Sequence, residues 1–294
     1  MKFGVGLPVL ETSPSGLPGD DFAEMVRYAE EAGFYATFLT DHPAPSRRWY
    51  ESGAELSFDP FVGLSFVAGV TKKIKLLTAL AVLGYRNPYL VAKSIATVDR
   101  LSNGRFVFGV GTGYLEPEFK ALDADFENRN ATFDDTLATL ISIWREPRAA
   151  TDPITLPIPV QPAGPPIWIG GNSRKARQRA ALFGDAWLPV FTRTRDDGKT
   201  GFRSPGLREV ATLKTQIDEL VAIADEHGRG RQIGVNPLIW DIDGLPSHKK
   251  LVEQLRDIGV HNVTVRCDAA TVADACRFID AYANDIIGNF DVSE

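Results

Sequence analysis

The chain has 294 residues, of which 44% are hydrophobic and 24% are charged, so its composition is that of an ordinary globular protein. Its formal net charge of -6 at pH 7 argues against nucleic acid or an anionic membrane as a partner, because both are bound by basic surfaces. No apolar run reaches the roughly 18 residues that span a bilayer, and Met1–Pro8 is too short and too glycine-punctuated for a signal peptide.

Strand-like and helix-like runs alternate along almost the whole chain. The predicted strands are, in chain order, Phe3–Leu7, Tyr35–Thr40, Ile74–Leu83, Phe106–Val110, Ile167–Ile169, Ala186–Val190, Ile233–Trp240 and His261–Arg266. The predicted helices lie near residues 21–32, 60–70, 88–102, 131–145, 173–183, 209–227, 247–258 and 271–286. This alternation favours a closed parallel barrel over an open Rossmann-like sheet, which is the alternative. The predicted fold class is therefore α/β, a (β/α)8 TIM barrel formed by residues 1–294 as a single domain.

Three connections are too long to be simple turns, namely Pro43–Asp59, Tyr114–Asn130 and Phe191–Arg208. Each of them follows a strand, so in a barrel all three lie at the C-terminal mouth, where long loops usually carry function. Residues 192–199 of the last loop are charged or small, which indicates a mobile flap. The segment Thr151–Pro166 carries six prolines and precedes a strand, so we expect it to be a structural cover on the opposite face.

The segment from Arg86 to Gly113 contains one complete helix–strand unit of such a barrel. Asn87 is placed to cap the helix and Pro88 to occupy its first turn, where a missing N–H group costs nothing. Asn103-Gly104 is typical of a helix end in left-handed geometry. The following strand ends in alternating glycines, and this end belongs to the mouth of the barrel.

A histidine stands at the mouth end of the second predicted strand, in Thr40-Asp41-His42. A histidine in this position suits general acid–base chemistry, because its ordinary pKa lies near neutral pH. Asp41 is placed to bind a ligand or to orient the loop. The alternative is that His42 only caps the strand end. The other histidines, His227, His248 and His261, have no spacing typical of a metal site.

Two glycine-rich strand ends are candidates for binding a phosphate. Gly109–Gly113 resembles half of a dinucleotide fingerprint, but Tyr114 stands where the third glycine belongs, and the alternative is that these glycines only let the strand turn. Gly170–Ser173 precedes a predicted helix, whose N–H groups and dipole favour an anion. Nearby basic residues add positive charge there, namely Arg174, Lys175, Arg177 and Arg179.

Five runs occur together and in order along the chain: Thr40–His42, Tyr85–Lys93, Asp99–Arg105, Gly109–Leu115 and Ile167–Ser173. With these runs the chain resembles the luciferase-like monooxygenase superfamily, and within it the coenzyme F-420-dependent oxidoreductases. The resemblance implies a TIM-like barrel with the coenzyme across its C-terminal mouth. It also implies a non-prolyl cis peptide bond, which would be Thr78–Ala79 here.

The same resemblance implies residue roles. His42 would transfer the substrate proton beside the coenzyme ring. The implied coenzyme-binding residues are Asp41, Thr78, Ala79, Gly111, Thr112, Gly113, Tyr114, Gly170, Gly171, Asn172 and Ser173. The chain departs from some sugar-phosphate dehydrogenases of the family at two positions, where Tyr114 replaces a glutamate and Ser46 a tryptophan. Glu116 or Glu118 could supply that carboxylate instead. Trp49 and Tyr50 could cover the coenzyme ring, and the alternative is that they only pack the loop.

The function that the resemblance implies is hydride transfer between coenzyme F-420, a deazaflavin, and a small organic substrate. The alternatives are an FMN-dependent monooxygenase, a non-catalytic flavin- or deazaflavin-binding protein and a coenzyme-free phosphosugar isomerase. A homodimer is expected from the family. Cys267 and Cys276 form neither a disulfide framework nor a CxxC pair, which indicates a reducing, cytoplasmic location and no metal.

Overall fold

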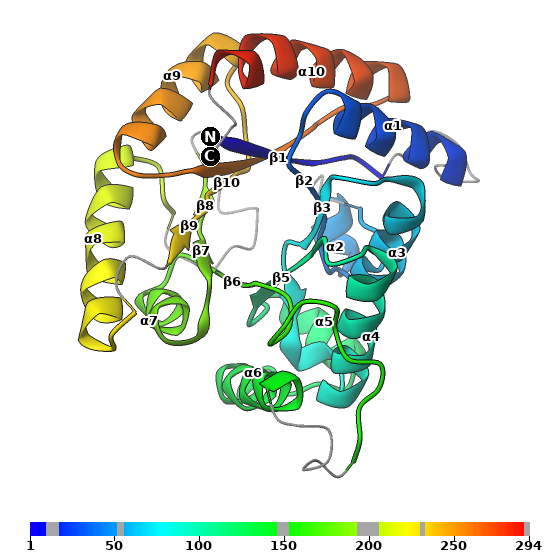
Figure 1. Ribbon diagram of the computed structural model, residues 1–294, viewed down its shortest axis with the longest axis vertical. Coiled ribbons are helices and arrows are strands. Elements are labelled where there is room, and N and C mark those ends of the chain that lie inside the picture. The colour runs from blue at the N-terminus through cyan, green and yellow to red at the C-terminus, as the bar shows by residue number, and fades with distance from the viewer. Residues whose placement is uncertain (10–17, 52–55, 146–152, 193–205, 230–232, 291–294) are drawn as a thin grey trace.

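The computed structural model describes residues 1–9, 18–51, 56–145, 153–192, 206–229 and 233–290 (Figure 1). Its strands are β1 (Lys2–Gly6), β2 (Ala36–Leu39), β3 (Lys75–Thr78), β4 (Ala81–Val82), β5 (Phe106–Gly111), β6 (Ile167–Gly170), β7 (Ala186–Leu188), β8 (Val190–Phe191), β9 (Gly234–Val235), β10 (Leu238–Ile239) and β11 (Asn262–Arg266). Its α-helices are α1 (Gly19–Glu31), α2 (Arg47–Glu51), α3 (Pro60–Val70), α4 (Pro88–Leu101), α5 (Glu116–Ala121), α6 (Arg129–Arg145), α7 (Arg174–Phe183), α8 (Val210–Glu226), α9 (Leu245–Asp257) and α10 (Val272–Asp285). Two 3-10 helical turns are η1 (Leu83–Tyr85), which precedes α4, and η4 (Ile287–Asn289), which follows α10.

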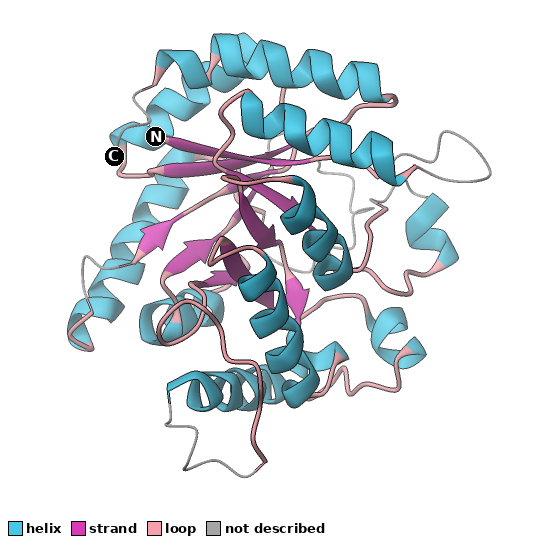
Figure 2. Ribbon diagram, turned by 45° about the vertical axis from the view of Figure 1, so that its right-hand side comes forward, coloured by secondary structure: helices cyan, strands magenta, loops and turns pink. Residues whose placement is uncertain are grey.

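The strands form one curved parallel sheet, and the helices cover its outer side (Figures 1 and 2). The strand order is β8-β10-β11-β1-β2-β3-β5-β6-β7-β9, with β4 paired to β5. The α/β class and the parallel sheet predicted from the sequence are confirmed. Every predicted helix is present, while α2 and α5 are additional short helices within the long connections after β2 and β5.

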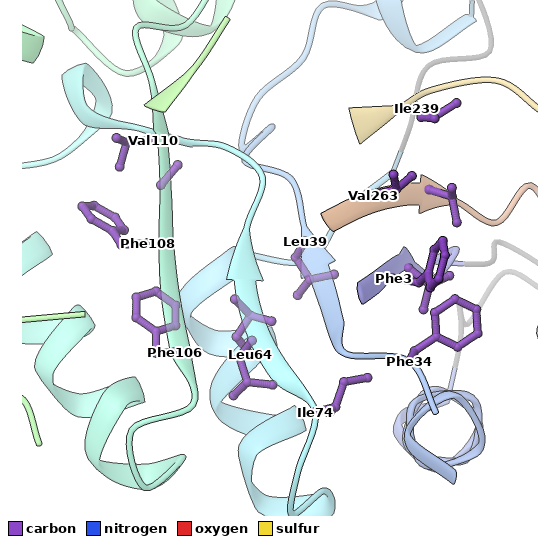
Figure 3. Packing of buried hydrophobic residues seen from close by; sticks show 14 of the residues in the cluster. Phe3, Phe34, Leu39, Leu64, Ile74, Phe106, Phe108, Val110, Ile239 and Val263 are labelled. Atoms are coloured by element: carbon purple, nitrogen blue, oxygen red, sulfur yellow. The ribbon is translucent and has the colours of Figure 1, made fainter. Parts of the chain in front are cut away.

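Side chains pack on both faces of the sheet, because successive residues of a strand point to opposite sides. On the outer side, Leu39, Phe106 and Val263 belong to a large cluster that also contains Leu64 of α3 (Figure 3). A second cluster occupies the inner side, with Phe38, Leu77, Val107, Trp168, Leu188, Leu238 and Trp240 among its members. The strands are therefore apolar on both faces, as parallel strands covered by helices must be.

The non-prolyl cis peptide bond is Ala79–Leu80, so the prediction of Thr78–Ala79 is wrong by one residue. Thr78 still belongs to β3 and pairs with Leu39 of β2. The Ala79 N–H group donates to the Leu39 carbonyl oxygen at 2.8 Å, so this residue also stays in the hydrogen-bonded ladder. The cis bond follows directly after this ladder, between β3 and β4, where the single strand predicted for Ile74–Leu83 is interrupted.

The proline-rich segment lies against α4 and not at the mouth. The carboxylate of Asp99, which is fully buried, accepts hydrogen bonds from the N–H groups of Val160 (2.6 Å) and Gln161 (3.1 Å) and from Gln161 Nε2 (2.7 Å). Lys93 Nζ donates to the Leu156 carbonyl oxygen at 2.5 Å. These contacts agree with a structural cover. The helix itself begins as predicted, with Asn87 Oδ1 accepting the Tyr89 N–H at 3.0 Å.

Part of the predicted flap, residues 193–199, lies outside the described residues. Among the helices that the structure does describe, none has the length and apolar character required to cross a membrane.

Replacing Asp99→Ala should lower the free energy of unfolding by about 2–4 kcal/mol, because it leaves buried N–H donors without an acceptor. Urea denaturation monitored by circular dichroism measures this loss. Asp135→Ala on exposed α6 surface is the matched control and should change stability by less than about 0.5 kcal/mol. An equally small loss for Asp99→Ala would contradict the assigned anchoring role.

Candidate active site

The predicted site residues follow four strands that are consecutive neighbours in the sheet, β2, β3, β5 and β6. Asp41 and His42 lie beyond the end of β2, and Thr78 and Ala79 lie at and just beyond the end of β3. The run from Gly111 follows β5, and the run from Gly170 follows β6. Because the strands are parallel, their carboxyl ends share one edge of the sheet. The structure therefore brings all of these predicted positions to the same edge.

Asp41 is buried, and its carboxylate oxygens are engaged by the protein. Oδ2 accepts the Val82 N–H at 3.0 Å, and the Arg86 guanidinium contacts Oδ2 and Oδ1 at 2.5 and 2.8 Å. Arg86 also contacts Asp59 Oδ2 at 2.9 Å, while Asp59 Oδ1 caps the first turn of α3. Burial lowers the pKa of Arg86, but its contacts with Asp41 and Asp59 outweigh burial and raise it overall. Asp41 therefore holds the backbone that presents His42.

The His42 side chain is 12% exposed and is surrounded by aromatic rings. Its ring centroid lies 4.5 Å from that of Trp49 in a tilted arrangement and 6.0 Å from that of Tyr114 in an edge-on arrangement. Trp49 is one of the two rings expected from the sequence to lie in this region. The imidazole is thus partly accessible, and its proton-transferring role stays a prediction.

The carboxylate beside His42 comes from α5. Glu118 Oε2 lies 3.2 Å from His42 Nδ1 and accepts the Tyr85 hydroxyl hydrogen bond at 2.8 Å. The Glu118 side chain has 0% exposure, and its Oε1 is buried without a hydrogen-bond partner in the described residues. Of the two glutamates considered from the sequence, Glu118 reaches the histidine, whereas Glu116 is exposed.

Tyr85 is a residue of this cluster to which the sequence assigned no role. Burial, and then the charge of Glu118, raise the pKa of Tyr85 well above its ordinary value of 10. The phenol therefore remains a hydrogen-bond donor throughout the physiological pH range. A carboxylate only accepts, so with Glu118 ionised the His42 proton lies on Nδ1 and Nε2 is left as the acceptor.

The glycines at the mouth make room for groups of the protein itself. A Cβ atom at Gly170 would lie 2.1 Å from Leu80 Cδ1, and one at Gly111 would lie 2.9 Å from the same atom. Gly113 has φ +74°, and a Cβ there would lie 2.7 Å from Phe119. A larger residue at Gly111 or Gly170 would displace Leu80, the half-buried residue that follows the cis bond, whereas one at Gly113 would displace Phe119. The glycine run thus shapes the mouth around Leu80.

The loop before α7 is built from local hydrogen bonds. The Asn172 amide exchanges two bonds with the backbone of Val190, each 2.8 Å long. Ser173 Oγ caps the helix by accepting the Ala176 N–H at 3.1 Å. Gly171 has φ +110°, and among the described residues a Cβ there would contact only Ala176 Cβ, at 3.4 Å, so these residues leave space above this backbone. The loop therefore offers an open backbone at a helix N-terminus.

The positive charge predicted near this loop is paired with carboxylates. Arg174 and Arg177 contact Glu219, and Lys175 and Arg179 contact Asp134. What remains for an anion at this helix is its dipole and the N–H groups of its first turn, which have no acceptor within the helix.

The chain is similar in sequence to several known proteins. Among similar proteins, the uncharacterized protein Rv0953c of Mycobacterium tuberculosis is 28% identical over 303 residues, covering 96% of this chain and 98% of its own. The F420-dependent hydroxymycolic acid dehydrogenase of the same species is 26% identical over 69% of this chain and 59% of its own. The FMNH(2)-dependent dimethylsulfone monooxygenase of Pseudomonas putida is 29% identical over 58% of this chain and 45% of its own.

Solved structures share the fold at low identity. The long-chain alkane monooxygenase LadA superimposes with a TM-score of 0.75 at 16% identity, covering 100% of this chain and 93% of its own. The coenzyme F420-dependent tetrahydromethanopterin reductase of Methanopyrus kandleri gives a TM-score of 0.73 at 15% identity, with 99% of both chains covered. The family model described as luciferase-like monooxygenase matches residues 1–231. The chain thus belongs to the luciferase-like monooxygenase family, an enzyme family.

Proposed function

We propose that this protein is a coenzyme F-420-dependent oxidoreductase that transfers a hydride between the deazaflavin and a small organic substrate. The observation that carries the proposal is the contact between His42 Nδ1 and the buried Glu118 Oε2 at the mouth. Hydride exchange at a carbon bearing oxygen requires a proton to leave or reach that oxygen. A histidine oriented by a carboxylate is suited to this step.

The proton-handling role of His42 follows from its partners. Glu118 accepts a hydrogen bond from the Nδ1–H group, which leaves Nε2 to take a proton from the substrate or to return it. The Tyr85 hydroxyl donates to the same carboxylate oxygen and fixes its position. When His42 is protonated, the adjacent carboxylate compensates its charge in a site shielded from water. Trp49 packs against the imidazole and limits its movement.

The residues present fit a phosphate-bearing coenzyme. The open backbone at Gly171, the first turn of α7 after Ser173, and Thr112 at the end of β5 would hold the phosphate. Ala79 and Leu80 would support the ring. When bound, a deazaflavin supplies a ring carbon that exchanges a hydride, whereas a flavin also reacts with oxygen. The two coenzyme types named for the similar proteins make a flavin or a deazaflavin the expected class.

We also propose that the sheet closes as a (β/α)8 TIM barrel and that residues 1–294 form a single domain. Pairing of β7 with β9 and of β8 with β10 supports closure, because β7 and β8 are separated by one residue and β9 and β10 by two. Counting β3 with β4, β7 with β8 and β9 with β10 as interrupted strands gives eight. Pairing of β1 with β11 joins the beginning of the chain to its last strand.

Titrating the coenzyme-free protein with each coenzyme tests the coenzyme assignment. We expect a micromolar dissociation constant for coenzyme F-420 and weaker binding of FMN, measured by quenching of coenzyme fluorescence. Micromolar binding of FMN with none of coenzyme F-420 would establish the FMN-dependent monooxygenase instead. Binding of the deazaflavin without turnover of alcohols, aldehydes or enones would favour the non-catalytic binding protein.

Replacing His42→Ala should reduce kcat by at least about 100-fold, because it removes the proton-transferring group. Glu118→Gln, which keeps the shape and loses the charge, should reduce kcat by about 10- to 100-fold. Both variants should keep the coenzyme dissociation constant of the wild type. Nitrogen-15 NMR should show the Nδ1–H tautomer of His42 in the wild type and its loss in Glu118→Gln.

Glu116→Gln is the matched control for Glu118→Gln, since it makes the same change on the exposed side of the same helix. It should leave kcat and the tautomer of His42 unchanged. A Glu118→Gln variant with wild-type kcat would reduce Glu118 to a packing residue and remove the main support for the proposed proton transfer.

We further propose that the chain forms a homodimer through the outer surface of α3, α4 and residues 153–160. Of the eleven large apolar side chains exposed in the described residues, eight lie there: Val62, Phe66, Tyr89, Leu90, Leu101, Ile154, Leu156 and Val160. Clustered exposed apolar side chains are typical of an interaction surface.

Leu90→Glu should therefore produce a monomer in size-exclusion chromatography with light scattering. Phe183→Glu, at an exposed apolar residue of α7, is the control and should not; an unchanged mass for Leu90→Glu would exclude this surface.

A further inference from the structure

The side chain of Arg266 lies on the inner face of the sheet, at the same edge as His42. Arg266 is the last residue of β11, and Val263 and Val265 of that strand belong to the outer cluster. Because side chains alternate along a strand, Arg266 points to the inner side. Its guanidinium carbon lies 4.7 Å from the centroid of the Trp240 ring, which belongs to the inner cluster.

The hydrogen-bonding capacity of Arg266 is only partly used. Its side chain is 13% exposed, and its NH2 group contacts the carboxylate of Asp268, whose own side chain is 67% exposed. Its Nε atom is buried and has no hydrogen-bond partner in the part of the chain that the structure describes. By contrast, Arg86 is held by two carboxylates, and Arg177 uses both Nε and NH2 on Glu219. The Arg266 guanidinium is therefore paired with Asp268 on the side that faces solvent, and its buried Nε–H group remains as a hydrogen-bond donor.

The surroundings of Arg266 separate it from the proposed phosphate site. In the sheet, β11 is followed by β1 and then by β2, which leads to His42. The proposed phosphate site follows β6, which lies three strands beyond β2 in this order. Arg266 is level with Gly6 of β1, and the ring of Phe38 fills the space that a Gly6 side chain would take, 2.3 Å from its ideal Cβ. The inner surface between Arg266 and the strand of His42 is thus aromatic. Directly after β2, Thr40 Oγ1 is also buried without a partner among the described residues.

We propose that Arg266 binds an anionic group of the substrate, a carboxylate or a phosphate, while the apolar body of the substrate packs against Phe38 and Trp240. A guanidinium group matches the two oxygens of such an anion with parallel N–H donors. Stacking on Trp240 holds the guanidinium plane in place. The inference rests on the proposed function only where it names the anion as part of the substrate, since anion binding at Arg266 requires neither coenzyme nor turnover.

Three probes with one phenyl body test the inference by isothermal titration calorimetry on the full chain without coenzyme: benzoate, phenyl phosphate and neutral benzamide. We expect benzoate or phenyl phosphate to bind at least about tenfold tighter than benzamide, and the tighter of the two identifies the anion. Arg266→Met should remove this preference, a loss of roughly 10- to 100-fold for the anion. Arg266→Lys, which keeps the charge without the fork, should give an intermediate affinity.

Arg256→Met is the matched control, because Arg256 also stacks on an aromatic ring, Phe290, and contacts an adjacent aspartate, but lies at the end of α9. It should leave probe binding unchanged. Asp268→Asn removes the competing carboxylate and should tighten anion binding; a loss equal to that of Arg266→Met would show a merely structural pair and overturn the inference. Circular dichroism melting confirms that each variant is folded.

Equal affinities for benzoate, phenyl phosphate and benzamide would overturn the inference, as would an anion preference that survives Arg266→Met, which would locate the anion elsewhere. Loss of coenzyme F-420 binding in Arg266→Met would assign the arginine to the coenzyme and overturn it too. These outcomes differ from failure of the proposed function, which appears as absent coenzyme binding or turnover in the wild type whatever the probes do.

Discussion

The buried ion pair between Asp41 and Arg86 is the interaction on which the geometry of the mouth depends. It connects the end of β2 to the turn before α4, and the second contact of Arg86 with Asp59 adds the start of α3. The same Asp41 carboxylate accepts the Val82 N–H, which fixes β4 immediately after the cis bond. Removing one partner of a buried pair costs about 3–5 kcal/mol, because the other charge is left without compensation. His42 is adjacent in sequence to this pair, so its position follows from it.

The irregular segment between β3 and β4 imposes a second constraint, because it requires glycine at neighbouring positions of β5 and β6. Leu80 occupies space above both β5 and β6, and only glycine at Gly111 and Gly170 leaves that space free. The Thr78 hydroxyl donates to the Gly109 carbonyl oxygen at 2.8 Å and ties the segment to β5. The glycines that resemble a phosphate-binding fingerprint are thus required first by internal packing. The open backbone that remains lies at Gly171, where the nearest side-chain atom is 3.4 Å from an ideal Cβ.

The parts of the fold that depend on local patterns could be predicted from the sequence. The start of α4 follows from its side-chain cap, Asn87, and the structure contains this bond. The contacts that assemble the site could not be predicted in this way. His42 and Glu118 are 76 positions apart, and Glu118 sits in a short helix whose sequence gives no sign that this carboxylate is fully buried. Likewise, the sequence does not show at which residue β3 stops pairing with β2, and the cis bond follows that residue.

The same contacts give a physical meaning to the departure at Tyr114. Where related sugar-phosphate dehydrogenases are expected to place a carboxylate directly after the strand, this chain places Tyr114, whose ring centroid lies 6.0 Å from that of His42. The carboxylate comes instead from Glu118 of α5 and contacts His42 Nδ1. The Tyr85 hydroxyl, which stays protonated because its pKa is raised, donates a hydrogen bond to the same carboxylate. A carboxylate on Nδ1 leaves Nε2 free to face the mouth, so in this arrangement the acid orients the histidine and does not compete with the substrate for it. The proposed substrate would then meet aromatic side chains on this side, and its proposed anionic group would bind Arg266 on the opposite side of β1.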